Sequence, residues 1–570
     1  MKTTELMKFV NSFNCIKRSM SLFKLLLWEN TMFVNSVLPP GELEKKFMIA
    51  VLITYKNKTK QLNMCRSPDD TVDTFLQRFA LKIQRINSKK GIQEPMLDLI
   101  SLKVNGQKVP KDTKCGEIFD NKNVNISLQI NNHFLSVMIN APIINNLVLG
   151  KPPYKGLMLY PCGFDKGYNV SILNSKYTWY RMKSKEFIEV GNEIAYTPSS
   201  SDINCKLKLL CEPCNLEGQL GPSVEVLSLE VQDNLIDIYP FEKRLIKKPK
   251  NSFRIISYNI LAGDYTKTKE AKNEMYPYCP AHILASSYRN PLLVKELQAY
   301  KADILCLQEV EVKLFNRELD PLLKNFLNLN GVHCKKDGNR NEGLSCFYSA
   351  DKFELLDQFC IKLNDRPTIE MYCGPFINAI YEDNIWKQGL EKKTVLQVLL
   401  LRKILENKLL LVCNTHLISD ADSDCVRLLQ ALVELTIITK LKKTFENQYP
   451  EQKLSVIFCG DFNSTPESGV FDLVTNLFLP FEYRDLNHLN NLKNVVDFTM
   501  SSAYSTNVPY SNFTQTFSGL LDYIYFTNEH LDVIQTLSMP LHEEVIEEGG
   551  LPSAKFPSDH LALIADFKMK

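Results

Sequence analysis

The heptapeptide 460–466, Gly-Asp-Phe-Asn-Ser-Thr-Pro, constrains the fold most, because it directly follows the apolar run 454–459. A short apolar run that ends in Gly, Asp and Asn predicts a buried strand that passes into a loop at its carboxyl end. Asp461 and Asn463 stand two residues apart, so in an extended segment their side chains point the same way. A carboxylate and a carboxamide together offer hard oxygen ligands suited to Mg²⁺. The alternative is a turn in which Asn and Pro serve only the conformation.

The same arrangement recurs elsewhere, with polar residues placed where an apolar run begins or ends. The run 254–258 leads into Asn259, 302–307 into Gln308 and Glu309, and 408–413 into Asn414 and His416, while Asp522 opens 522–526 and Asp559 and His560 precede 561–565. Polar residues at the ends of successive core strands converge on one rim, where open α/β sheets bind their ligands. The sequence therefore predicts one site assembled from several strands.

These residue types suit metal-assisted and acid–base chemistry on a phosphate. Glu309, Asp461 and Asp559 can bind a divalent cation that keeps several waters. The residues that can donate to phosphate oxygens are His416, His560, Asn259 and Asn463. Asp559 beside His560, or Asp522 on another strand, could orient an imidazole as buried carboxylates do. A hydrogen-bonded structural histidine is the alternative for each ring, but only eight His occur in 570 residues and two of them adjoin apolar strands beside Asn or Asp.

Six motifs containing these residues resemble the endonuclease/exonuclease/phosphatase superfamily in order and rough spacing. They are Ser257-Tyr-Asn-Ile-Leu261, Leu307-Gln-Glu-Val310, Asn414-Thr-His416, Gly460-Asp-Phe-Asn-Ser-Thr-Pro466, Leu521-Asp-Tyr-Ile524 and Ser558-Asp-His560. Secondary motifs such as Tyr276-Pro-Tyr-Cys279 and Asn341-Glu-Gly-Leu344 resemble the deadenylase branch, most closely its mitochondrial 2′,5′-phosphodiesterases. The resemblance covers about residues 250–570 strongly and about 135–235 weakly. It implies an α/β fold, a two-sheet α/β sandwich catalytic domain, preceded by β-rich modules.

The resemblance also implies a role for each matching position. Glu309 would be the principal Mg²⁺ ligand, Asp461 and Asn463 would complete the metal and phosphate site, and Mn²⁺ could substitute. Asp461 would also activate the attacking water. The residues that would hold phosphate oxygens or orient other groups are His560 paired with Asp559, His416, Asn259 beside Glu309 or a second metal, and Asp522 beside a histidine. Phe517 matches an aromatic that resembles the adenine-stacking platform of deadenylases, with a core aromatic as the alternative.

One stretch departs from the family pattern. After Asn414-Thr-His-Leu417 the family carries an aromatic-Trp-(Asp/His)-Pro stretch, whereas residues 418–421 here read Ile-Ser-Asp-Ala. The Trp and Pro help to shape the nucleotide pocket of relatives, so the departure bears on base preference. The residues that the chemistry needs are all present, so it does not bear on hydrolysis.

The preferred interpretation is a Mg²⁺-dependent phosphodiesterase and 3′-exoribonuclease that releases AMP from 2′,5′-oligoadenylate and 3′ poly(A). One alternative is another hydrolase of the same fold, a DNA repair endonuclease or inositol phosphatase, which the flanking motifs disfavour. The other is a catalytically silent RNA-binding scaffold, which the presence of Glu309, Asp461 and His560 disfavours. The implied partner is RNA or oligoadenylate; the sequence indicates no membrane association and no protein partner.

The chain divides into five expected segments. They are a possible transit or disordered segment at 1–45, a small α+β module at 46–135, an immunoglobulin-like β-sandwich at 136–235 with Trp179 in its core, a solvated basic linker at 236–250, and the catalytic domain at 251–570. In the second segment we expect strands at 47–54 and 124–130, a helix at 71–86 and a hairpin at 104–109. A long helix at about 426–448, ended by Pro450, is expected in the catalytic layers.

The first segment and the cysteines bear on compartment. Lysines interspersed with Leu, Phe and Ser before Glu29 suit an Arg-poor mitochondrial transit segment, so the mitochondrial matrix is expected, with the cytoplasm as the alternative. The apolar run 21–33 is interrupted by charges and shorter than the about 20 residues of a membrane span. The 16 cysteines, several in apolar strands, indicate buried thiols of a reducing compartment, and Cys211-Glu-Pro-Cys214 lacks the second pair of a zinc site. The net charge of +2 excludes a polybasic binder.

Overall fold

The computed structural model describes residues 31–570 apart from 38–43, 56–57, 89–99, 122–123, 131–132, 145, 151, 165–166, 184–185, 234–238, 339–340, 375–383, 421 and 479–494. Most of the expected transit segment, and Ala421 of the departing stretch, therefore lie outside the described residues. The chain forms two compact units. The first comprises Met1–Asn146, Lys166–Tyr177 and Leu210–Val224, and the second Leu147–Asp165, Thr178–Leu209 and Glu225–Lys570.

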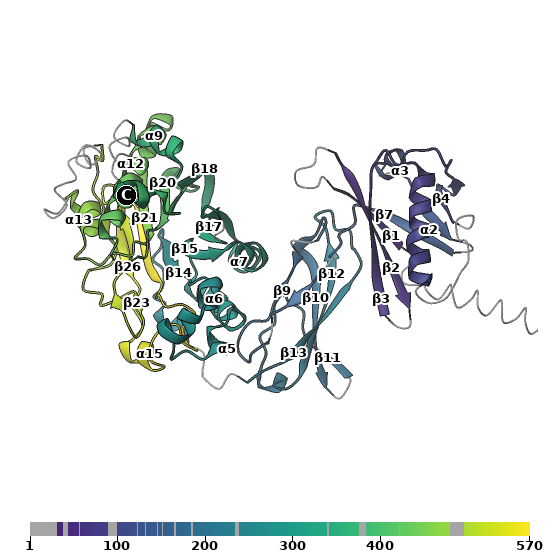
Figure 1. The fold of residues 1–570 in the computed structure, drawn as a ribbon, viewed down its shortest axis with the longest axis horizontal. Helices are drawn as coiled ribbons and strands as arrows, with labels where there is room; N and C mark the ends of the chain where they lie inside the picture. The colour runs from purple at the N-terminus through teal and green to yellow at the C-terminus, as the bar shows by residue number, and fades with distance from the viewer. Residues whose placement is uncertain are drawn as a thin grey trace, which may run out of the picture. The chain divides into compact units, whose positions relative to one another are not determined.

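The first unit contains a seven-stranded sheet with the strand order β3-β2-β1-β7-β6-β4-β5 (Figure 1). Its strands are β1 Thr31–Val37, β2 Lys46–Tyr55, β3 Lys58–Arg66, β4 Ile100–Val104, β5 Gln107–Lys108, β6 Ile126–Ile130 and β7 His133–Ile139. Helix α2 (Val72–Ser88) buries Phe75 and Phe79 in the core of this unit, and α3 (Cys115–Phe119) adds Phe119. The tight turn between β4 and β5 uses Asn105 and Gly106 at φ of 51° and 82°, as the hairpin signal predicts.

The boundary expected at residue 45 differs in the structure. Strand β1 lies before it and pairs with β2 antiparallel and with β7 in parallel. Met32 and Val34, two residues apart, point the same way and are fully buried in the core of the first unit. The small module therefore begins by residue 31, and β7 carries it past residue 135.

Strands β10 to β13 form a four-stranded sheet with the order β11-β10-β12-β13, whose residues are shared between the two units. Its strands are β10 Ser171–Lys183, β11 Glu186–Gly191, β12 Lys206–Cys214 and β13 Val224–Glu230. Trp179 is fully buried, stacks on Tyr196 at 5.9 Å between ring centroids, and donates its indole N–H to the Glu193 carbonyl at 2.9 Å. The immunoglobulin-like class of this segment stays a prediction.

Two six-stranded sheets form the α/β part of the second unit, in the orders β16-β17-β15-β14-β27-β26 and β18-β19-β20-β21-β25-β22 (Figure 1). The strands of the first sheet are β14 Phe253–Asn259, β15 Ile304–Glu311, β16 Leu329–Lys335, β17 Glu342–Ser349, β26 Leu531–Thr536 and β27 Leu563–Met569. Those of the second are β18 Phe353–Lys362, β19 Val395–Lys403, β20 Lys408–His416, β21 Leu454–Asp461, β22 Ser501–Ser502 and β25 Asp522–Phe526. Strands β14, β17, β21 and β25 are buried along their whole length, so the polar residues that they carry, such as Arg254, Asn259 and Asp461, are buried with them.

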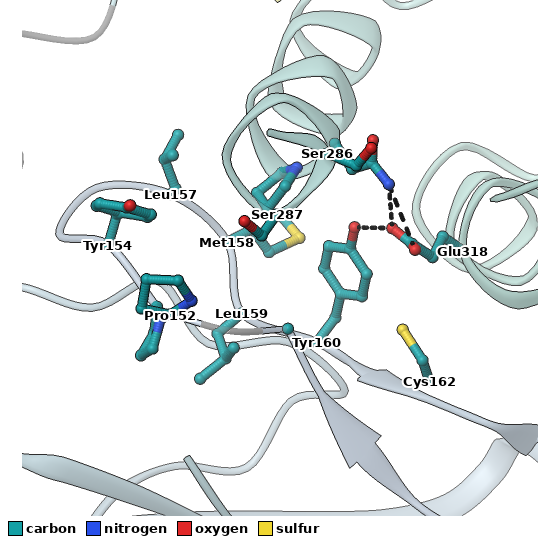
Figure 2. Close-up of a pocket in the computed structure, with 14 residues that line it drawn as sticks. Pro152, Tyr154, Leu157, Met158, Leu159, Tyr160, Cys162, Ser286, Ser287 and Glu318 are labelled. Atoms are coloured by element: carbon teal, nitrogen blue, oxygen red, sulfur yellow. Dashed lines mark hydrogen bonds between the residues drawn. The ribbon is translucent and has the colours of Figure 1, made fainter. Parts of the chain in front are cut away.

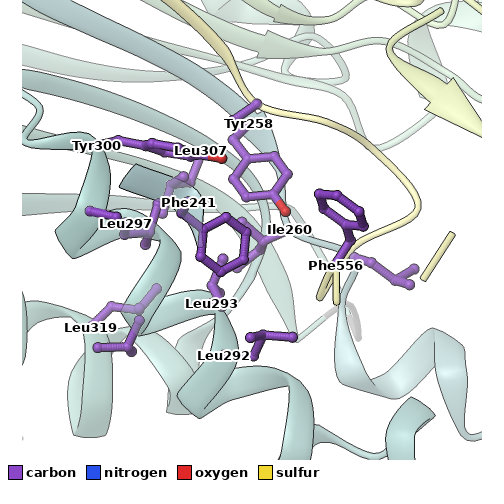
Figure 3. Packing of buried hydrophobic residues seen from close by; sticks show 14 of the residues in the cluster. Phe241, Tyr258, Ile260, Leu292, Leu293, Leu297, Tyr300, Leu307, Leu319 and Phe556 are labelled. Atoms are coloured by element: carbon purple, nitrogen blue, oxygen red, sulfur yellow. The ribbon is translucent and has the colours of Figure 1, made fainter. Parts of the chain in front are cut away.

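Helices cover the outer face of each sheet, so the predicted two-sheet α/β sandwich is confirmed. One apolar core holds residues of both sheets, such as Ile255 and Val412. A second core joins the first sheet to α6 (Ser286–Tyr300) and α8 (Asp320–Leu327), where Leu293 and Phe556 pack (Figure 3). A third joins the second sheet to α12 (Asp424–Gln448), the expected long helix, which buries polar residues such as Gln430 and Glu434 together with its apolar ones. The other helices are α4 Gly263–Thr266, α5 Ala281–Leu284, α7 Val312–Leu314, α9 Arg366–Cys373, α11 Asn384–Glu391, α13 Gly469–Asn476 and α15 His542–Ile546.

The basic stretch expected as a solvated linker is only partly solvated. Lys243 and Lys250 are exposed, but Arg244 is buried. Its guanidinium donates to the Tyr300 hydroxyl at 2.8 Å and to the Ala562 carbonyl at 2.9 Å. A buried guanidinium needs such acceptors, so this segment is fixed to the α/β sandwich rather than free in solvent.

At one place the structure differs from the expectation that the cysteines are free thiols. Cys334 of β16 and Cys360 of β18 form a disulfide. Of the other described cysteines, only Cys65 and Cys425 are exposed. Cys211 and Cys214 are both buried and belong to no group of three potential metal ligands within the described part of the chain. None of the described helices is long and apolar enough to cross a membrane.

Candidate active site

The register of the strands brings the predicted polar residues to one rim of the sandwich. Strands β14 and β15 run parallel and pair Asn259 with Gln308, so Glu309 follows one residue beyond that pair. In the second sheet, β20 and β21 run parallel and pair His416 with Asp461. Parallel strands end at the same edge, which is why residues far apart in the sequence meet here.

The Asn259 carboxamide connects the two sheets. Its Nδ2 donates to Glu309 Oε1 at 3.1 Å and to Asp461 Oδ2 at 2.9 Å, and its Oδ1 accepts from the Leu261 N–H at 3.0 Å. The other Glu309 oxygen accepts from the Ala262 N–H at 2.8 Å. Glu309 itself has a φ of 60°, a left-handed conformation that is uncommon outside glycine and often found at functional sites. The two carboxylates are thus held by one neutral amide.

His560 forms an ion-paired group with two aspartates. Its Nδ1 lies 2.7 Å from Asp522 Oδ2, and its Nε2 lies 3.6 Å from Asp461 Oδ2. Burial alone would lower the pKa of His560, but the charges of Asp522 and Asp461 raise it well above its usual value. The ring is therefore an imidazolium at neutral pH, and the Ser511 hydroxyl, which donates to Asp522 at 2.7 Å, fixes the aspartate that orients it.

The expected pairing of His560 with Asp559 is not found, because Asp559 has another partner. Its Oδ2 accepts from the Tyr276 hydroxyl at 2.7 Å. Asp522 lies on β25 directly opposite Asp461 and reaches the imidazole instead. Asp559 faces Glu309 closely enough for its charge to contribute to the raised pKa of that residue. Asp522 therefore takes the orienting role, and Asp559 adds negative charge to the site.

His416 is neutral where His560 is charged. Burial, with the positive charges of Lys336 and His560, lowers the pKa of His416 well below its usual value. Lys336 Nζ lies 3.4 Å from His416 Nδ1, and since an ammonium only donates, Nδ1 accepts and the proton is on Nε2. That nitrogen lies 3.6 Å from Asp461 Oδ2, so the neutral ring presents an N–H donor to the site.

Asn463 and Phe517 lie on loops beside these groups. The Asn463 N–H donates to Asp461 Oδ1 and its carboxamide donates to the Leu417 carbonyl, both at 2.9 Å. Phe517 precedes β24 (Ser518–Gly519), which pairs with β23 (Asn512–Phe513), and Asn512 forms a β-bridge with His560. The ring is 43% exposed, and a Cβ on Gly519 would lie 2.8 Å from it, so the glycine makes room for this aromatic. Phe517 is thus a half-exposed aromatic on the hairpin joined to His560, not a core residue.

The carboxylates of the site fit a divalent cation. Burial, with the charges of Asp559 and Glu342, raises the pKa of Glu309 to about 7, and burial, with the charge of Asp522, raises that of Asp461 to about 6. Asp522 Oδ1 is buried without a hydrogen-bond partner. Asp461, Asp522 and His560 offer ligand atoms within 4.8 Å of one another, but the imidazolium of His560 already engages both aspartates. Glu309 and Asp461, both oxygen donors, remain as the pair suited to Mg²⁺.

Four residues of the site were missed in the sequence. Lys336 contacts His416 and forms an ion pair with Glu342 at 3.1 Å, and the Tyr265 hydroxyl donates to the same Glu342 oxygen at 3.0 Å. Tyr276 binds Asp559. Glu342 and Tyr276 lie in the secondary motifs 341–344 and 276–279, which could have indicated them. Lys336 stands in no motif, so only the structure identifies it.

Comparisons with known proteins agree with this geometry. The profile of the Endonuclease/Exonuclease/phosphatase family matches residues 256–560. The 2′,5′-phosphodiesterase 12 of Rattus norvegicus is 34% identical over 415 residues, 69% of this chain and 64% of that protein, and that of Homo sapiens is 36% identical over 403 residues, 66% and 62%. The CCR4-Not complex 3′-5′-exoribonuclease subunit Ccr4 of Schizosaccharomyces pombe is 28% identical over 350 residues, 56% of this chain and 49% of that protein. The chain thus spans less than two thirds of the length of these relatives. Since the family profile matches more than half of its 570 residues, the chain belongs to the Endonuclease/Exonuclease/phosphatase family.

Proposed function

We propose that the second unit is a Mg²⁺-dependent phosphodiesterase and 3′-exoribonuclease that releases AMP from 2′,5′-oligoadenylate and from 3′ poly(A). The observation that carries the proposal is the single Asn259 amide that holds Glu309 and Asp461, from two sheets, beside the imidazolium of His560. Relatives named as a 2′,5′-phosphodiesterase and as a 3′-5′-exoribonuclease support the choice of substrate class.

Glu309 and Asp461 would hold the ion, with Asn463 at its phosphate side. When bound, Mg²⁺ supplies Lewis-acid polarisation of a phosphoryl oxygen and charge neutralisation in a site of buried carboxylates. Asn259 fixes the orientation of both carboxylates through its donated hydrogen bonds, so the ligand set is preorganised. The left-handed backbone at Glu309 belongs to the same arrangement.

The protein's own donors would stabilise charge on the phosphate. His560, held as an imidazolium by Asp522, presents a cationic donor, and His416 presents a neutral Nε2–H. Lys336 adds a second positive charge that Glu342 positions. Asp461 accepts from Asn259 and the Asn463 N–H and, in our proposal, takes the proton of the attacking water. Donors fixed before the reaction stabilise the transition state without reorganisation.

Release of AMP from two substrates measured side by side tests the proposal. We expect Mg²⁺-dependent AMP release from 2′,5′-triadenylate and from 3′,5′-oligo(A), lost on addition of excess chelator. Activity only on an abasic-site DNA duplex or an inositol phosphate would favour another hydrolase of the same fold. Binding of oligo(A) without AMP release would favour the silent scaffold.

Replacing Phe517 by alanine should separate base recognition from chemistry. The half-exposed ring can stack on a base, so Phe517→Ala is expected to weaken binding of adenylates of either linkage by roughly 1–3 kcal/mol, about ten- to a hundredfold. It should hardly change hydrolysis of bis-(p-nitrophenyl) phosphate, which offers no base. The matched variant His560→Ala should slow all three substrates alike, by about 10²-fold or more. Equal losses on every substrate in Phe517→Ala would make Phe517 structural.

A mitochondrial location is part of the proposal, supported by the Lys-containing amino-terminal segment. Residues 1–30 fused to a fluorescent reporter are expected to direct it into mitochondria. A shortened protein should begin at residue 31 rather than 46, because β1 is part of the core of the first unit. If the reporter stays in the cytosol, a cytoplasmic location is favoured, and the proposed activity is unaffected.

A further inference from the structure

A cavity of about 180 Å³ lies in the second unit, between residues 152–162 and the amino-terminal turns of α6 (Figure 2). Most of its wall is apolar. The wall residues of this kind are Pro152, Pro153, Tyr154, Leu157, Met158 and Leu159. Tyr154 packs edge to face against Tyr288 of α6, with ring centroids 5.0 Å apart, so this wall is fixed to the catalytic layers.

One end of the cavity is polar, and a carboxylate stands there. Glu318 accepts from the Tyr160 hydroxyl at 2.6 Å and from the Asn290 carboxamide at 3.2 Å (Figure 2). Ser286 and Ser287, at the start of α6, also line the cavity (Figure 2). Both hydrogen-bond partners of Glu318 are neutral. Among the described lining residues, Glu318 is the only acidic or basic one.

The charge of Glu318 is not neutralised within the cavity. The partners that Glu318 contacts among the described residues, Tyr160 and Asn290, are uncharged, and the positive charge of Arg317 lowers the pKa of Glu318 only weakly. Burial is the main reason why the pKa of Glu318 is raised. The amino end of α6 contributes a partial positive charge of about one half, which is smaller than the full charge of an ionised carboxylate. A cation placed beside Glu318 would restore the lost solvation.

We propose that this cavity binds a small organic cation with an apolar body, such as an amine, amidine or guanidine. The head group would donate charge-assisted hydrogen bonds to Glu318, which are about twice as strong as neutral ones. The body would lie against Tyr154, Met158 and the prolines, with cation–π attraction from the tyrosine rings. Cavities of about 150 Å³ accept benzene, and sites for drug-sized ligands begin near 300 Å³, so a ligand of one ring fits.

The site is separate from the one proposed for hydrolysis but connected to it through two residues. A Cβ on Gly263 would lie 2.2 Å from Ser286 Oγ, and the preceding Ala262 N–H holds Glu309. Ser286 therefore touches the backbone that positions the proposed metal ligand. The binding proposal itself does not depend on the proposed hydrolytic activity, and its test uses no substrate.

Benzamidine and its neutral isostere benzamide form a matched pair of probes for the full-length protein. The two are nearly the same size, but only benzamidine is cationic at neutral pH. Titration followed by ligand-observed NMR, with excess MgCl₂ to protect the carboxylates of the active site, is expected to show benzamidine bound at least tenfold more tightly.

Three variants locate the binding. Glu318→Gln keeps the shape of the side chain and should abolish the difference between the two probes. Met158→Trp fills the cavity and should remove binding of both. Asp320→Asn, a neighbouring carboxylate that does not line the cavity, should leave binding unchanged. Equal affinity for both probes in the unaltered protein, or benzamidine binding that survives both Glu318→Gln and Met158→Trp, would overturn the proposal and leave Glu318 as a brace between Tyr160 and Asn290.

Discussion

Replacing Glu309 by glutamine is expected to abolish Mg²⁺-dependent turnover while the protein stays folded. The carboxylate accepts from Asn259 on one oxygen and from the Ala262 N–H on the other, so a carboxamide would point its NH₂ at one of these donors. The variant would lose a charged oxygen ligand for the ion and the preorganisation of the site together. We expect a fall of about 10³-fold or more, at the upper end of what loss of one preorganised group costs.

Thermal unfolding with and without Mg²⁺ supplies a readout that is independent of activity. An ion that binds only the folded state raises the unfolding temperature, and Glu309→Gln should lose most of that rise. Without metal the variant should be no less stable, because the half-buried carboxylate stands near the charges of Asp559 and Glu342. Glu311→Gln, two residues further along β15, is the matched control and should keep both turnover and the Mg²⁺ response. Unchanged kinetics in Glu309→Gln would show that Glu309 is not a ligand of the ion.

The meeting of the strand ends could be predicted because it follows from local pattern, whereas the two-sheet sandwich was implied by the resemblance to the family. An apolar run that is buried on both faces, such as 454–461, has to be a central strand. The polar residues at such ends, Asn259, Glu309, His416 and Asp461, meet because β14 and β15, and β20 and β21, are parallel. The helix at 424–448 and the β4–β5 hairpin could also be predicted, since Pro450 marks the end of the helix and residues 105–106 are local turn signals.

Pairings between side chains were harder to predict because they depend on register and depth. Asp559 is the sequence neighbour of His560, yet Asp522, 38 residues away, makes the 2.7 Å contact, because β25 lies opposite Asp461 in the sheet. Lys336 enters the site from the end of β16 with no motif around it. Chemistry thus indicated which kinds of residue would gather, and topology determined which of them touch.

The predicted boundaries between segments differ from the structure for a related reason. Residues 31–37 were included in the amino-terminal segment expected at 1–45, but Met32 and Val34 belong to the core of the first unit. Arg244 stands in a run of basic residues that is typical of a solvated linker, yet it is buried against Tyr300 and the Ala562 carbonyl. Residues 154–162, expected within a β-sandwich, pack into the core beneath α6. Composition over a short window carries no information about such long-range packing.

A buried ion pair at the opposite end of β14 from Asn259 carries the largest expected effect on stability. Arg254 of β14 and Asp566 of β27 face each other in register, with Nε–Oδ1 at 2.7 Å and Nη2–Oδ2 at 2.8 Å. Both are almost fully buried. Asp566→Ala leaves the guanidinium without its counter-charge, so we expect the unfolding free energy of the second unit to fall by about 3–5 kcal/mol.

Urea denaturation followed by far-UV circular dichroism measures this loss, and an exposed pair on the same sandwich gives the control. Glu354→Ala breaks the surface ion pair of Glu354 with Arg402 and should change the unfolding free energy by at most about 1 kcal/mol, because solvent screens it. The double variant Arg254→Met, Asp566→Ala should recover only part of the loss, since the Tyr300 and Ile246 carbonyls then lose their donor. A loss below about 1 kcal/mol in Asp566→Ala would show that other contacts, such as those to the two carbonyls, compensate the charge of Arg254.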